Sequence, residues 1–141
     1  MSLFPRSFIF AGNLSRAYYW AGQRAKATAA YEHAIALGLD ELSVNPRNAD
    51  AHISLARYYA MLGRKAEALS HLTTALTLRP NEAEYLSYAA VIHNQLGDRA
   101  SAMASLKKAL SLGWSMAEIN SEVEFDSLRT GTDFQKTVGT N

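Results

Sequence analysis

Histidine and carboxylate side chains are the groups in this chain that could do acid–base or metal chemistry. The four histidines are His33, His52, His71 and His93. No two of them stand four residues apart, and none belongs to the H-E-x-x-H motif that binds catalytic zinc on a helix. We expect His52 and His93 to be partly buried packing residues, and the other two to lie on helix surfaces.

Other patterns that carry catalysis are missing from the sequence. There is no cysteine, no G-x-S-x-G elbow, no Walker glycine–lysine loop and no kinase catalytic segment. Glu122 and Glu124 are two apart, so on a helix their carboxylates would point away from each other. We therefore expect no catalytic residue, no metal site and no cofactor, and predict that the chain is not an enzyme.

Composition narrows the class of partner. The chain has 141 residues, a net charge of +1 and 19% charged residues, which argues against the concentrated positive charge that nucleic-acid binding needs. Its apolar runs are too short for a signal-peptide core or a membrane span. A cysteine-free chain fits a reducing compartment, so we expect a soluble, cytoplasmic protein that binds neither nucleic acid nor membranes.

An internal repeat in the sequence shows which helices would position a functional site. The hexapeptides GQRAKA, GRKAEA and GDRASA begin at Gly22, Gly63 and Gly97, with offsets 63 − 22 = 41 and 97 − 63 = 34. Apolar residues before and after each glycine recur at helical spacing. Each glycine is therefore predicted to form the turn between two antiparallel helices.

Small residues recur at fixed places around these glycines, where they would let two helix axes approach closely. The recurring set is Ser15, Ala56 and Ala90 before the glycines, and Ala27, Ala68 and Ala102 after them.

The pattern resembles the tetratricopeptide repeat, a helix–turn–helix unit of ~34 residues. The second copy carries the most matches, and they are Leu55, Ala56, Tyr59, Gly63, Ala68, Leu72, Ala75 and Pro80. The resemblance implies an all-α fold, a right-handed α-solenoid of three helix pairs with a C-terminal helical cap. The expected organisation is a single domain, 1–141, with repeats at 7–46, 49–82 and 83–116 and a cap at 117–141.

The first repeat is seven residues longer than the second, because the offset between the first two glycines is 41 residues and the next offset is 34. Seven residues are almost two helical turns, so a lengthened second helix keeps its apolar face until Pro46 stops it. Gly38 stands against this, because glycine weakens a helix by ~1 kcal/mol. We prefer the continuous helix; the alternative is that Gly38 ends it, which a positive φ there would show.

The last segment, residues 114–141, leaves the repeat pattern. Ser115 and Glu118 suggest a capping box and a short helix from Met116. The segment resembles the ending common after tetratricopeptide arrays in bacterial multidomain proteins, with Gly113, Trp114, Phe125, Leu128, Arg129, Phe134 and Gln135. An alternative function is thus the C-terminal regulatory part of a larger bacterial kinase, cyclase or transcriptional regulator.

The resemblance also implies a binding surface, because in this family the first helix of each repeat lines a concave groove for peptides or helices. The leading expectation is a non-catalytic protein-interaction scaffold whose partner the sequence does not identify; a homodimer is another possibility. Groove residues carried over by position are Ile9, Arg16, Tyr19, Trp20, Asp50, Ile53, Arg57, Met61, Asn94 and Gln95. The carboxylate grip of chaperone-binding members is not expected, since its positions hold Gly12, Arg16, Ser54, Glu84 and Tyr88.

Overall fold

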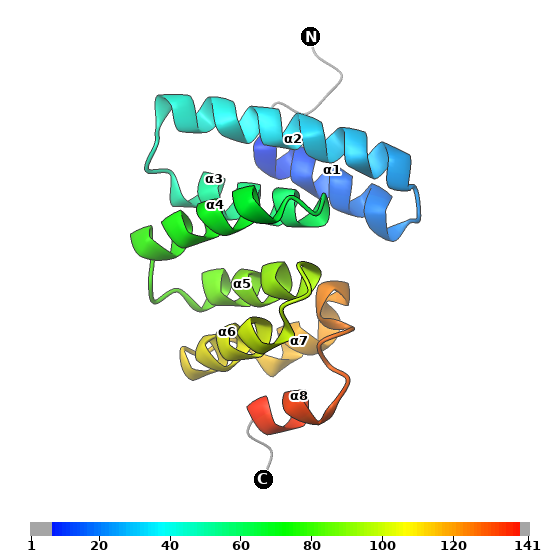
Figure 1. Ribbon diagram of the computed structural model, residues 1–141, viewed down its shortest axis with the longest axis vertical. Helices are drawn as coiled ribbons and strands as arrows, with labels where there is room; N and C mark the ends of the chain where they lie inside the picture. Colours follow the sequence, from blue (N-terminus) through cyan, green and yellow to red (C-terminus); the bar gives the residue numbers. More distant parts are fainter. Residues whose placement is uncertain (1–6, 139–141) are drawn as a thin grey trace. The chain divides into compact units, whose positions relative to one another are not determined.

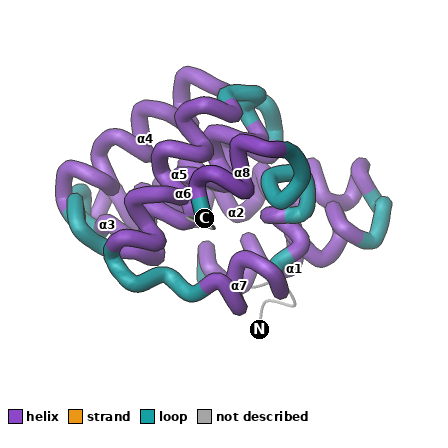
Figure 2. The backbone as a smooth tube through the Cα atoms, turned by 90° about the horizontal axis from the view of Figure 1, so that it is seen from below, coloured by secondary structure: helices purple, strands orange, loops and turns teal. Residues whose placement is uncertain are grey.

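The protein is built from antiparallel helix pairs. The computed structural model describes residues 7–138, and this range contains helices and turns without a strand (Figures 1 and 2). The all-α prediction is confirmed. The elements are α1 Phe8–Trp20, α2 Arg24–Val44, α3 Ala49–Met61, α4 Lys65–Leu78, α5 Ala83–Gln95, α6 Arg99–Ser111, α7 Met116–Ser121, the 3-10 helix η1 Val123–Phe125 and α8 Thr132–Thr137.

Glycine at each predicted turn explains why the helices reverse where they do. Gly22, Gly63 and Gly97 have φ of 82°, 73° and 84°, a left-handed conformation that residues with a Cβ rarely adopt. Each follows the first helix of a pair, so the predicted turns are confirmed. Asn48 and Asp98 then cap α3 and α6 by accepting hydrogen bonds from Ala51 N and Ser101 N.

The chain divides into two compact units, one ending at Leu78 and the other beginning at Arg79. In unit 1, α1 pairs with α2, α3 pairs with α4, and α2 packs along α3. In unit 2, α5 pairs with α6, and α8 packs on α6.

Helix α2 runs through Gly38 without a break and ends at Val44, with Asn45 as its C-cap just before Pro46. Gly38 is not among the glycines of positive φ, so the continuous helix is confirmed and the C-cap alternative is wrong. The glycine is needed for a close approach: a Cβ there would lie 2.9 Å from Leu55 Cδ2 on α3. The glycine thus lets the lengthened helix pack along α3.

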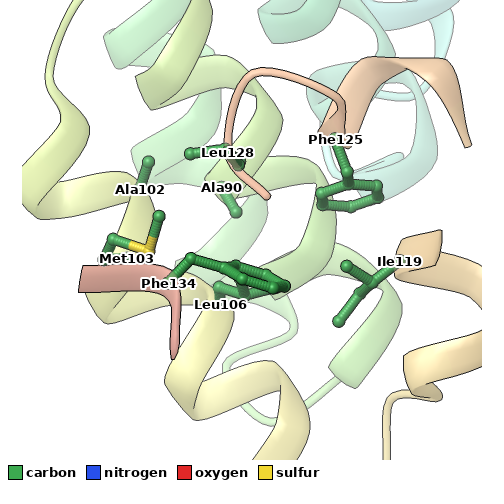
Figure 3. Close-up of a cluster of buried hydrophobic side chains, with 8 residues drawn as sticks. All are labelled: Ala90, Ala102, Met103, Leu106, Ile119, Phe125, Leu128 and Phe134. Carbon is green, nitrogen blue, oxygen red and sulfur yellow. The ribbon is translucent and has the colours of Figure 1, made fainter. Parts of the chain in front are cut away.

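The C-terminal segment packs on the α5–α6 pair within unit 2. Ser115 caps α7, where its hydroxyl accepts from Ala117 N at 3.0 Å, so the predicted helix start at Met116 is confirmed. Phe134 packs beside Leu106 in a buried cluster (Figure 3). The buried cluster is Ala90, Ala102, Met103, Leu106, Ile119, Phe125, Leu128 and Phe134. The predicted cap is thus confirmed.

Candidate interaction surface

The predicted binding face begins with an aromatic pair at the end of α1. Tyr19 and Trp20 meet edge to face, with ring centroids 5.0 Å apart. The guanidinium of Arg24 lies 3.7 Å from the centroid of the Tyr19 ring, in cation–π contact. Trp20 remains 44% exposed, and Ile9, about three turns before it, is exposed as well. This arrangement offers an apolar surface with positive charge at its edge.

Tyr58 joins α1 to α3 in unit 1. Its ring lies over Gly12, where a Cβ would be only 2.0 Å from the Tyr58 hydroxyl oxygen, so α1 needs glycine at this crossing. The hydroxyl donates to the carbonyl oxygen of Phe8 at 2.8 Å. Burial raises the pKa of Tyr58, while Arg57 and Ser54 partly oppose the shift. The phenol therefore stays a neutral donor that fixes the start of α1 beside α3.

The groove positions on α3 differ in exposure. Asp50 is exposed, and Arg57 and Met61 are half-buried. Ile53, a predicted groove residue, is only 3% exposed, so its side chain offers a ligand almost no contact area. Its β-branched side chain belongs to the packed interior, which the carry-over from family positions did not distinguish from the surface. The face of unit 1 that remains comprises Ile9, Arg16, Tyr19, Trp20, Asp50, Arg57 and Met61.

In unit 2 the C-terminal segment already occupies part of the predicted groove positions. The Asn94 amide donates to Ser127 Oγ at 2.7 Å, and Val91 packs against the buried cluster. Gln95 remains exposed at the end of α5. A ligand could therefore reach Gln95 directly, whereas Asn94 already has a partner within the chain.

The positions of the chaperone-type carboxylate grip are used differently. Tyr88 donates to the Glu84 carboxylate at 2.7 Å, and Gly12 lies under Tyr58. Only Arg16 in this set is cationic. The contacts give a carboxylate ligand no cluster of donors at these positions.

The sequence predicts that His71 lies on an open helix surface, and this prediction is wrong. Its ring stacks on Tyr59, with centroids 5.6 Å apart and planes 9° from parallel, and its Nδ1 lies 3.0 Å from His52 Nδ1. His52 and His93 are half-buried, as predicted. Sequence reasoning missed the His52–His71 pair because the two residues are 19 apart and come from different helices.

The hydrogen bonds of this pair restrict its protonation. His52 Nε2 lies 2.9 Å from the carbonyl oxygen of Pro46, which can only accept, so Nε2 carries a proton. The short Nδ1–Nδ1 distance then allows one proton between the two rings. Burial, helped by His52, lowers the pKa of His71, while Glu67 partly opposes the shift.

The described residues contain no group of three or more His, Asp or Glu side chains that could hold a metal ion.

Comparison with known protein families agrees with this architecture. Three tetratricopeptide repeat models match in succession, at residues 11–42, 49–82 and 84–112. The chain belongs to the tetratricopeptide repeat family. This membership supports a protein-interaction scaffold, and the second match has the same bounds as the predicted second repeat.

Solved structures with the same fold include MamA proteins. One, named MamA MSR-1 C2, is 29% identical and aligns with a TM-score of 0.52 over 77% of this chain and 58% of its own length. Another, MamA D159K mutant 2, is 24% identical, with a TM-score of 0.50, over 85% and 81% of the two chains. This chain thus spans less than two thirds of the first protein. No curated protein sequence matches it.

Proposed function

We propose that this protein is a non-catalytic scaffold that binds a peptide or a helix of another protein on the α1–α3 face of unit 1. The observation that carries the proposal is the aromatic pair Tyr19–Trp20, with Trp20 exposed, at the end of the helix whose start Tyr58 holds beside α3. Aromatic and arginine side chains are those that most often dominate interface energy. Arg16 and Arg57 flank the same face by position.

The Tyr19 ring is already held before any ligand arrives. Arg24 stacks on it from the start of α2, and Trp20 meets its edge. A ligand that covers Trp20 therefore gains apolar contact without first ordering the neighbouring rings, which lowers the entropic cost of association. The exposed carboxylate of Asp50 at the other end of the face favours ligands with a basic group there.

Quantitative affinity capture from the source cells tests this proposal. Trp20→Ala and Arg57→Ala should each reduce recovery of a specific partner by at least about tenfold, as truncation of an interface hot spot does. Lys107→Ala, on the exposed face of α6, is the matched control and should leave recovery unchanged. Circular dichroism should show equal helix content in all four proteins.

The proposal fails if the partners of wild type and of both face variants are the same in identity and amount. It also fails if Lys107→Ala loses the partner equally, since the loss would then not map to the α1–α3 face.

The alternative, a regulatory segment of a larger bacterial enzyme or transcriptional regulator, draws support from the cap. Phe125, Leu128 and Phe134 of the tail motif are buried together, and Arg129 donates to the carbonyl oxygens of Ile119 and Glu122. The motif residues thus hold the cap together. The genomic reading frame upstream of Phe4 tests this alternative: a kinase, cyclase or DNA-binding domain in frame would support it, and a stop codon would exclude it.

A further inference from the structure

The α1–α2 pair has a second apolar face, turned away from α3. With about 100° per residue, Leu14 and Tyr18 lie about 200° and 240° around α1 from Gly12, which contacts α3. Lys26, Ala29, Ala30 and His33 lie about 180–280° around α2 from Gly38, which also contacts α3. These residues line a hollow of about 440 Å³. We call this surface the outer face.

The chain itself shows what such a face accepts. Adding the offset of 41 residues places Leu14 at Leu55 and Tyr18 at Tyr59 in the second repeat. Leu55 is fully buried because α2 of the preceding repeat crosses it at Gly38. Leu14, at the equivalent place, is 37% exposed. The outer face therefore has leucine and tyrosine at the two positions where α3 has Leu55 and Tyr59. Within the described part of the chain, no helix packs across these two residues of α1 as α2 packs across α3.

Charge adds a second requirement. Residues 8–31 contain Arg16, Arg24 and Lys26 and no Asp or Glu. The segment of α2 that crosses α3, residues 31–44, carries Glu32, Asp40 and Glu41 and no Lys or Arg. The helix segment that covers the second repeat is thus acidic, amphipathic and glycine-bearing. Of the three cations in residues 8–31, Lys26 lines the outer face, whereas Arg16 and Arg24 lie about 40° around their helices from Gly12 and Gly38, on the α3 side.

We propose that the outer face binds an acidic amphipathic helix of a partner protein, with a glycine crossing at Leu14. The proposal goes beyond the α1–α3 face, because it uses the opposite side of α1. A second copy of this chain fits less well. Two outer faces would bring like charges together, and the acidic Gly38 segment of each copy is already covered by its own α3.

A fluorescent peptide with the sequence of residues 28–44, TAAYEHAIALGLDELSV, is the probe, titrated against the full chain and followed by anisotropy. We expect saturable binding that weakens with salt. Leu14→Glu and Lys26→Glu should each weaken it by about tenfold or more, since one places a charge in an apolar contact and the other removes the complementary charge. A peptide with leucine in place of its glycine should lose binding.

Three controls keep the result specific. Lys107→Glu makes the same charge change on α6 and should leave the affinity unchanged. Trp20→Ala should also leave it unchanged, which separates this face from the α1–α3 face. Lys26 is exposed, so Lys26→Glu tests the proposal even if Leu14→Glu fails to fold.

The proposal is overturned if the peptide does not bind up to its solubility limit, or if neither Leu14→Glu nor Lys26→Glu weakens binding. The second result would mean that the peptide displaces α2 from α3. A concentration-dependent dimer in light scattering that Leu14→Glu abolishes would assign the face to a second copy and also overturn it.

Discussion

His52 and His71 form a close pair of titratable side chains that the sequence did not reveal. The two Nδ1 atoms lie 3.0 Å apart, and burial lowers the pKa of His71 below its ordinary 6.5. Their contact was not predictable, because the 19-residue separation has meaning only once the pitch between α3 and α4 is known.

The pair makes stability depend on pH. A histidine whose pKa is lower in the folded state favours folding fully above ~pH 6.5, and this contribution falls as pH drops below that value, because the unfolded chain takes up the proton more readily. His71→Phe keeps the ring stack on Tyr59 but does not titrate. We expect its melting temperature to fall less than that of wild type between about pH 7.5 and pH 5.

His33→Phe, at an exposed site of α2, serves as the control for the loss of a histidine outside the pair. His93, whose pKa burial also lowers, contributes with the same sign and remains in both variants. Equal slopes for wild type and His71→Phe would contradict the role of the pair.

At the scale of elements, the repeat periodicity predicted the helices and their turns because a left-handed glycine is a local requirement. Gly38 shows where local reasoning reaches its limit. Propensity alone disfavours glycine inside α2, and only the position of Leu55 on another helix explains it. Likewise, Ile53 matches a groove position in sequence but is buried, since exposure depends on neighbours that family positions do not specify.

The close approach at Gly38 makes a substitution prediction. Gly38→Ala should gain ~1 kcal/mol of helix propensity, but the added methyl group overpacks against fully buried Leu55, which costs ~1–3 kcal/mol. We expect urea unfolding to show a net loss of about 1 kcal/mol. Ala36→Gly, at an exposed site of the same helix, should lose a similar amount through propensity alone. A more stable Gly38→Ala protein would show that Leu55 does not limit this position.

Arg99 holds the C-terminal segment on α6 and gives a second prediction at this scale. Its guanidinium makes two hydrogen bonds to Asp133, at 2.6 and 2.9 Å, and also binds the carbonyl oxygens of Ser127, Leu128 and Thr130. Lysine does not reproduce this forked geometry. In Arg99→Lys we expect faster amide hydrogen exchange across residues 116–137, with little change in α5.

Arg79→Lys is the matched control on the same unit, because Arg79 forms an exposed pair with Glu82 at 3.4 Å and a cation–π contact with Tyr85 on α5. If both variants exchange at the wild-type rate in residues 116–137, the Arg99 contacts do not hold the cap.

For the whole molecule, family and fold class followed from the sequence because three copies in register leave few alternatives. The cap was also predictable, since a repeat end exposes an apolar face that needs cover. The sequence could not show that Asn94 is bound by Ser127 of the cap, or that the first pair keeps an open outer face. Both depend on contacts between segments far apart in the chain.

The buried cluster of unit 2 predicts how a fragment behaves. Residues 79–141 should fold alone into helices with a cooperative melt, because Leu106, Phe125 and Leu128 complete a core of their own. Residues 79–115, without the cap, should lose the melt and bind a hydrophobic dye. Circular dichroism and dye fluorescence check both. Equal behaviour of the two fragments would show that the cap is dispensable.

The most direct test of a protein-interaction scaffold is site-specific photo-cross-linking in the source cells. A photoreactive phenylalanine analogue at position 20 should capture one protein well above background, and Arg57→Ala in the same chain should abolish the product. The analogue at position 107, on α6, should not capture it. A product from position 107 as strong as that from position 20, or none from position 20, would contradict binding on the α1–α3 face.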